Sequence, residues 1–229
     1  MSQDKTVFCL WSGGLDSTYM IWDYLNKGYF VKAGYVEIKN NKHKTKIELK
    51  AIKEMVKIFN EYNFVYLDKI TTISINNGFS FLTNFSQIPI WLLSILIDHE
   101  CDKIAIGYVM NDDAISYLDD FQKIYKSYKS LYKYEDKKYP ILEFPLKKEN
   151  KEYIYNSLPE NLRKHIVFCE TPILKNKKYI PCLKCDSCKT RLYLELNDII
   201  PIYEHKCLPL YLKEYKNKKS QNQIKPERK

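Results

Sequence analysis

The chain has 229 residues, 45% of them hydrophobic, so it is long enough and apolar enough to form a core rather than a disordered segment. Its formal net charge is +9, yet only three of its 37 basic residues are arginine, so the lysines indicate a solvated surface more than a nucleic-acid-binding face. The longest apolar run, residues 88–97, is about half as long as a membrane span, and no export signal precedes the first strand-like run. We therefore expect a cytoplasmic protein with no membrane partner.

Strand-like and helix-like segments alternate along the chain. Short runs rich in β-branched and aromatic residues are followed by segments with an apolar stripe at helical spacing. This alternation predicts an α/β fold, in which right-handed βαβ units build a parallel sheet with helices on both faces. The predicted strands are residues 5–11, 29–38, 63–70, 103–108 and 140–144, and the predicted helices are 15–27, 44–62, an apolar helix ending near 100, and 117–134.

A glycine-rich stretch, Ser12-Gly13-Gly14-Leu15-Asp16-Ser17-Thr18, stands where the first strand ends and the first helix begins. Ligands bind at this edge of an α/β sheet, and glycines there let backbone N–H groups surround an anion. The helix N-terminus and three hydroxyl groups add donors, which suits a phosphate or pyrophosphate. Asp16 would repel a phosphate unless a cation lay between them, so we expect Mg²⁺ to bridge the two. A plain strand–helix turn with Asp16 as the helix cap is the simpler alternative.

Four of the seven cysteines lie close together near the C-terminus: Cys169, Cys182, Cys185 and Cys188. The last three have C-x2-C-x2-C spacing, and the set supplies the four thiolates of a closed tetrahedral Zn²⁺ site. An iron–sulfur cluster also takes four thiolates and stays open as an alternative, as do unrelated buried or redox cysteines. Zinc would hold together a segment too small to fold by itself.

The strand–helix alternation ends near residue 147, which is the one candidate domain boundary. We expect an α/β nucleotide-binding domain at 1–147 and a helical, zinc-binding segment packed on it at 148–212. The basic stretch 213–229 has the composition of a disordered tail.

The Ser12–Thr18 stretch resembles the signature of the PP-loop ATP pyrophosphatases, which have an adenine-nucleotide alpha-hydrolase-like fold. Members of this superfamily split ATP into AMP and pyrophosphate and adenylate a carbonyl or carboxylate oxygen. The resemblance implies ATP and Mg²⁺ as cofactors, with Asp16 and Ser17 as catalytic residues. The ATP-binding set that it implies is Leu10, Ser12, Gly13, Gly14, Leu15, Asp16, Ser17, Thr18 and Tyr35.

The combination of this stretch with the cysteine segment "CLKCDSCKTR" resembles the 7-cyano-7-deazaguanine synthase family of the queuosine pathway. That family uses ATP to convert 7-carboxy-7-deazaguanine, through its amide, to the nitrile. The resemblance implies a deazapurine substrate, ammonia or another amine as nitrogen donor, and a homodimer. His43, Gly107 and Asp112 match family positions near the substrate.

Two departures from the family pattern affect the substrate side. The family's Pro-Gly-Arg-Asn segment corresponds here to Ser86–Trp91, "SQIPIW", and Lys46 stands where an acidic residue is expected. Because lost polar contacts redirect specificity, three alternatives stay open. They are a divergent relative that joins the activated acid to a protein or nucleic-acid amine in a phage or anti-phage defence system, a tRNA thiolase with Cys182 and Cys185 as sulfur carriers, and a zinc-ribbon nucleic-acid-binding module.

Overall fold

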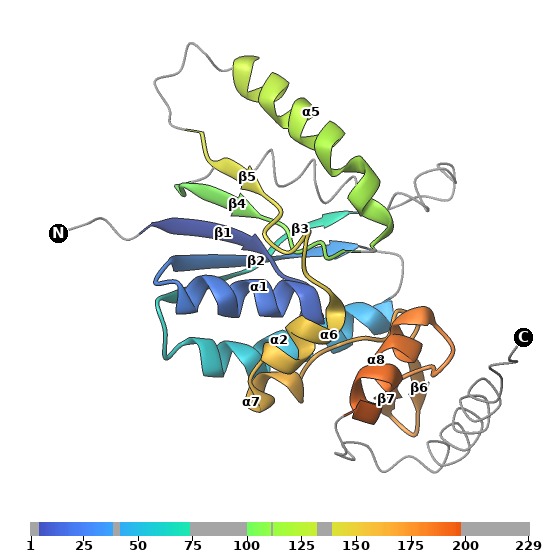
Figure 1. Ribbon diagram of the computed structural model, residues 1–229. Helices are drawn as coiled ribbons and strands as arrows, with labels where there is room; N and C mark the ends of the chain where they lie inside the picture. Colours follow the sequence, from blue (N-terminus) through green and yellow to red (C-terminus); the bar gives the residue numbers. More distant parts are fainter. Residues whose placement is uncertain (1–4, 39–41, 74–99, 111, 132–138, 198–229) are drawn as a thin grey trace, which may run out of the picture. The chain divides into compact units, whose positions relative to one another are not determined.

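Figure 1 shows the computed structural model of the chain. The structure describes residues 5–38, 42–73, 100–110, 112–131 and 139–197. Residues 1–194 belong to one compact unit, and 195–229 to a second, of which only 195–197 are described. The apolar run 88–97, the Ser86–Trp91 segment and the tail 213–229 lie outside the described residues. In the described part of the chain, no helix combines the length and apolar character that crossing a membrane requires.

Five strands form a wholly parallel sheet in the order β3-β2-β1-β4-β5, which confirms the predicted α/β class. The strand order reverses at β1, because β2 lies on one side of it and β4 on the other. Ligands of open α/β sheets bind at such a reversal, outside the carboxyl ends of the strands. The strands are β1 (Thr6–Leu10), β2 (Phe30–Ile38), β3 (Phe64–Ile73), β4 (Lys103–Ala105) and β5 (Ile141–Glu143).

Hydrophobic clusters lie on both faces of the sheet, as the alternation of β1 requires. Val7 and Cys9 pack in one cluster with α1, α2, α6 and α7, whereas Phe8 and Leu10 pack in the other with α5. In Figure 1, α1, α2 and α6 accordingly lie on one side of the sheet and α5 on the other. The helices are α1 (Leu15–Asn26), α2 (Lys42–Phe59), α5 (Leu118–Leu131), α6 (Lys151–Ser157), α7 (Glu160–Arg163) and α8 (Asp186–Asn197), with a 3-10 turn η1 (Asp113–Tyr117) before α5.

A small antiparallel hairpin follows Cys169 and was not foreseen from the sequence. It consists of β6 (Ile173–Lys175) and β7 (Lys178–Ile180). Strands of three residues are too short to show an alternating pattern. The turn between them places Asn176 at φ 50° and Lys177 at φ 59°, both left-handed, as a type I′ turn requires. Asn is common at the first of these positions, but Gly is preferred at the second, so a lysine there masks the turn.

Candidate functional site

The loop after β1 contains Gly13, at a position where any other residue would introduce strain. Gly13 has φ +72°, in the left-handed region that side chains disfavour. A Cβ atom on Gly13 would also lie 3.3 Å from Ile52 Cγ1 and 3.4 Å from the carbonyl oxygen of Glu48. Both neighbours belong to α2. The glycine therefore lets the loop turn while its backbone lies against α2.

Two hydroxyl groups face each other across the loop. The Ser12 and Ser17 Oγ atoms are 3.2 Å apart, and the Ser12 N–H donates to Ser17 Oγ at 3.3 Å. The Gly14 N–H donates to Ser12 Oγ at 3.4 Å. These contacts are longer than the usual distances of about 2.7–2.8 Å for hydroxyl donors and 2.9–3.0 Å for N–H donors, so a better acceptor can replace them. Gly14 is the N-cap of α1 and no side chain caps this helix, so its first N–H groups face the same place.

Four other residues of the predicted ATP-binding set lie in the core. Leu10 and Leu15 are buried on opposite faces of the sheet. The Thr18 hydroxyl accepts a 3.0 Å hydrogen bond from the Trp11 indole and donates to the Met55 sulfur at 3.9 Å. The Tyr35 hydroxyl donates to Glu48 Oε2 at 2.7 Å. The hydrogen bonds of Thr18 and Tyr35 are thus made within the core and not to the serine pair: Thr18 links α1 to α2, and Tyr35 links β2 to α2.

Asp16, in the first turn of α1, lies in a cluster of charges at the reversal of the strand order. Lys151 Nζ is 3.7 Å from Asp16 Oδ2 and 3.0 Å from Asp112 Oδ1. The other Asp16 oxygen, Oδ1, is buried and has no hydrogen-bond partner in the described part of the chain. Burial raises the pKa of Asp16 to about 6, with Lys151 opposing the shift and Asp112 adding to it. Burial also acts to lower the pKa of Lys151, but the two carboxylates outweigh it and raise that pKa.

Sequence reasoning missed Lys151, although one signal for it existed. Lys151 is the first residue of α6, directly after its N-cap Asn150. A positive charge at the positive end of a helix is unfavourable unless anions compensate it. Lys151 is therefore a candidate functional residue that faces the predicted Asp16 and Asp112.

Gly107 allows the segment after β4 to approach the start of α1. A Cβ atom on Gly107 would lie 3.1 Å from the Asp16 carbonyl oxygen and 3.3 Å from the Ser17 nitrogen. Asp112 closes the turn that follows, since its Oδ2 accepts from the Val109 N–H at 3.0 Å. Gly107 and Asp112 are thus brought to Asp16, as expected for one site. His43 instead has its ring 5.4 Å from the ring of Tyr179 in β7.

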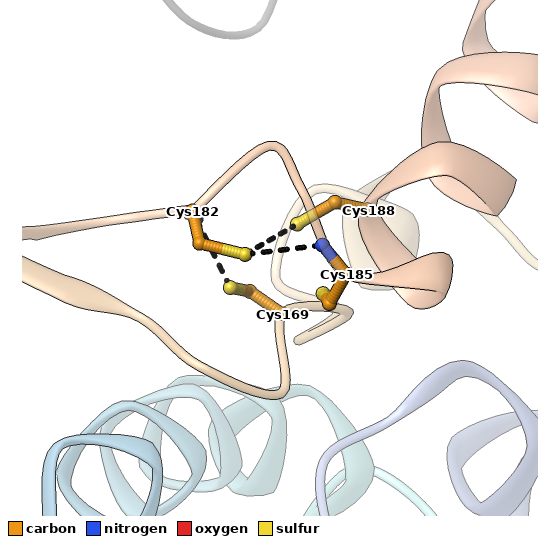
Figure 2. A group of neighbouring side chains, drawn as sticks. All are labelled: Cys169, Cys182, Cys185 and Cys188. Carbon is orange, nitrogen blue, oxygen red and sulfur yellow. Dashed lines mark hydrogen bonds between the residues drawn. The ribbon is translucent and has the colours of Figure 1, made fainter.

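The four clustered cysteines converge on one point. Their sulfur atoms all lie within 4.8 Å of one another, and Figure 2 shows the side chains turned toward a common centre. Cys169 and Cys188 are buried, whereas Cys182 and Cys185 are half-exposed. Leu183, at φ 59°, turns the backbone between Cys182 and Cys185. The spacing predicted from the sequence is therefore matched by a group of thiols that can hold a metal ion.

The protein already stabilises a thiolate in this group. Cys182 Sγ accepts from the N–H groups of Lys184 and Cys185 at 3.4 and 3.3 Å. Burial opposes ionisation, but hydrogen bonds from Thr171 and these two N–H groups lower the pKa of Cys182 to about 6. Thiolates in a tetrahedral zinc site lie about 3.8 Å apart for a Zn–S distance of about 2.3 Å. A small contraction of the group therefore fits a single zinc ion, whereas a cluster of several iron atoms needs more room.

The segment that precedes Cys169 contacts the glycine-rich loop. The Val167 N–H donates to the Gly13 carbonyl oxygen at 3.0 Å, two residues before Cys169. On the other side of Cys169, Glu170 pairs with Lys44 of α2, which also lies 3.8 Å from Glu48. The segment that carries the first cysteine therefore holds the loop at its backbone.

Comparison with known proteins gives no family. No family model matches the chain, and no curated protein matches it. Among solved structures it is similar to one described as a predicted subunit of tRNA methyltransferase from Methanocaldococcus jannaschii, with a TM-score of 0.43 and 14% identity. The likeness covers 66% of this chain and 73% of that chain.

Proposed function

We propose that the chain is an ATP-dependent enzyme that adenylates a carboxylate, releases pyrophosphate and passes the activated acyl group to a nitrogen nucleophile. The observation that carries the proposal is the pairing of an uncapped helix start with a charged cluster. The Ser12–Ser17 hydroxyl pair and the first turn of α1 lie at the strand-order reversal, beside Asp16 and Lys151. An anion-binding loop beside both a carboxylate and an ammonium group suits cleavage of ATP between its α- and β-phosphates.

Binding of pyrophosphate needs the donors of the loop. The Ser12 and Ser17 hydroxyls hold each other only at 3.2 Å, so phosphate oxygens would replace this contact. The backbone N–H groups at the start of α1 would donate to the same oxygens. Lys151, whose pKa is raised, would bring a fixed positive charge to the bond that breaks.

The residues present also fit a magnesium ion. Asp16 offers Oδ1, a buried oxygen without a partner in the described part of the chain, and carboxylate oxygens are the ligands that Mg²⁺ prefers. A bound Mg²⁺ would neutralise charge on the leaving pyrophosphate. Lys151 would then turn from Asp16 toward the phosphates while staying within reach of Asp112, from which it lies 3.0 Å away. Catalysis would depend on positioning of the reactants and on electrostatic stabilisation, so this mechanism does not need a general base beside the loop.

For the substrate we propose 7-carboxy-7-deazaguanine, with conversion to the amide or nitrile, on the sequence resemblance alone. The structural zinc site at the four cysteines belongs to the same proposal. A thiolase that uses Cys182 and Cys185 as free sulfur carriers is disfavoured, because the four sulfurs lie within 4.8 Å of one another as a closed set. If the deazapurine acid is activated but not converted with ammonia, a protein or nucleic-acid amine becomes the proposed acceptor.

The test is an assay of the purified full-length chain with ATP, Mg²⁺, ammonium and 7-carboxy-7-deazaguanine, with AMP and the base followed by mass spectrometry. We expect AMP in proportion to amide or nitrile, and a fall of at least about 100-fold for Asp16→Asn and Lys151→Met. Lys126→Met, an exposed lysine on α5, is the matched control and should keep full activity. Other carboxylates are offered in parallel assays. If the chain binds ATP but releases no AMP with any carboxylate, the proposed adenylation is wrong. If AMP is released only with another carboxylate, the proposed substrate is wrong.

A further inference from the structure

The hairpin β6–β7 concentrates positive charge at its turn. Lys175 and Lys178 are directly opposite each other in the strand register, and Lys177 stands in the turn between them. All three are exposed. From residue 171 to residue 185 the chain has four lysines, these three and Lys184, and no acidic residue.

This arrangement is unfavourable for the hairpin by itself. Like charges directly opposite on an antiparallel pair repel each other, because their Cβ atoms are only about 4.5–5.5 Å apart. Lys177 adds backbone strain, since a non-glycine residue at φ 59° occupies the left-handed region. Backbone strain and repelling charges that gather in one place point to a ligand that compensates them.

The base of the hairpin is anchored, so its tip is held in place. Cys169 precedes β6 and Cys182 follows β7, and the Cys182 N–H donates to Cys169 Sγ at 3.2 Å. The Tyr179 ring contacts the ring of His43 on α2. Because the base of the hairpin is fixed, a polyanion can bind the lysines at its tip without the entropic cost of ordering a flexible segment.

We infer that this lysine hairpin binds the phosphate backbone of a nucleic acid. The distribution of apolar residues favours this over a lipid surface. The exposed Ile173 pairs with Ile180 at the cysteine end of the hairpin, whereas the lysines occupy the tip. A hairpin that entered a bilayer would carry its apolar residues at the tip instead. A two-stranded ribbon also fits the width of the major groove of B-form DNA, and the closely spaced phosphates of either nucleic acid match closely spaced lysines.

The inference is independent of the adenylation chemistry, and salt dependence tests it. Binding of the full-length chain to a fluorescent RNA of about 20 nucleotides and to a DNA duplex of similar length is measured between about 50 and 200 mM salt. Three phosphate contacts contribute about 2–3 to the slope of log K against log salt, which is a loss of about 20- to 40-fold over this range. The variant Lys175→Ser/Lys177→Gly/Lys178→Ser should lose that share of the slope.

Two further variants separate the hairpin from general charge and from folding. Lys53→Ser/Lys126→Ser/Lys164→Ser removes the same charge from exposed positions outside the hairpin and should keep the wild-type slope. Lys177→Gly alone relieves the strained turn, so its thermal midpoint should stay or rise while its slope falls by about 0.7–0.9.

Three results would overturn the inference. They are no nucleic-acid binding by the wild type at about 50 mM salt, an equal slope change in the control triple variant, and a hairpin-dependent affinity for polyglutamate or anionic vesicles that exceeds the affinity for nucleic acid.

Discussion

Asp16 carries the clearest conflict between folding and function in this chain. Its carboxyl group is held beside Lys151, yet the buried Oδ1 has no partner among the described residues. An unsatisfied buried polar atom costs stability, and the cation proposed above would offset that cost. Burial also raises the pKa of Asp16 to about 6, because it disfavours the ionised carboxylate.

The variant Asp16→Asn is expected to be more stable than the wild type at neutral pH, without nucleotide and with divalent cations chelated. Because the native pKa of about 6 exceeds the ordinary 3.8, the native state binds more protons between about pH 4 and 6, and wild-type stability falls as pH rises through this window. The variant lacks this loss. Its advantage in free energy of unfolding should be on the order of 3 kcal/mol at pH 8 and near zero at pH 4, measured by urea denaturation.

Asp120→Asn is the control, because it removes one negative charge from the exposed face of α5. A pH-independent effect of Asp16→Asn would show that the Asp16 carboxyl ionises in the native state as it does in water.

At the scale of elements, the loop between β1 and α1 is held by three separate segments. α2 meets Gly13, the segment after β4 meets Asp16 at Gly107, and Val167 hydrogen-bonds to Gly13. The third contact is the one that a metal ion can control, because Val167 lies two residues before Cys169.

Removal of the metal should therefore loosen the loop as well as the cysteine segment. We expect about one zinc per chain, and faster amide hydrogen exchange at residues 165–190 and also at 12–18 after chelation. ATP affinity should fall in parallel. Hydrogen-exchange mass spectrometry with and without chelator measures both regions.

The matched control is Cys101→Ser, which changes a cysteine outside the group. This variant should bind as much zinc as the wild type. Faster exchange confined to 165–190 would contradict the link between the cysteine group and the loop.

At the scale of the whole unit, the two faces of the sheet have different tasks. The cluster that contains α1, α2 and α6 supports the loop, whereas none of the contacts of the loop described above involves a residue of α5, which packs in the other cluster. Met55 belongs to the first: it is fully buried, accepts from the Thr18 hydroxyl, and its Cε would lie 3.7 Å from a Cβ on Gly13. Phe121 is buried in the second.

Met55→Ala and Phe121→Ala should each lower the free energy of unfolding by about 2–5 kcal/mol, because both leave a cavity. Only Met55→Ala should also weaken binding of a non-hydrolysable ATP analogue, measured by calorimetry at a temperature where both variants stay folded. Met55→Leu, which keeps the volume, should restore both quantities to within about 1.5 kcal/mol. An equal loss of affinity in Phe121→Ala would contradict the division between the two faces.

Much of this fold was predictable from the sequence, because β-strand and helix periodicities alternate clearly up to Glu143. The glycine-rich loop and the cysteine group were predictable for a different reason: close backbone approach and thiolate convergence require particular residues at particular spacings. Lys151 was not predicted, because its one local signal, a lysine in the first turn of α6, does not show which carboxylates it pairs with. The roles of Thr18 and Tyr35 were also hidden, because hydroxyl groups serve a ligand or the core equally well. The β6–β7 hairpin was not predicted, because its turn has Lys177 at the position where glycine usually marks such a turn.

The hydrogen bond from Val167 to Gly13 has a consequence for the order in which the protein matures. Chains emerge from the ribosome N-terminus first, so the glycine-rich loop is made long before the segment that holds it. A nascent chain that ends before Val167 has the whole SGGLDST motif but lacks one of the three contacts that hold this loop. The nucleotide binding proposed above should then reach its full strength late, once the C-terminal segment has been released and Val167 can hold Gly13, so that truncated translation products would compete only weakly with the finished protein for ATP.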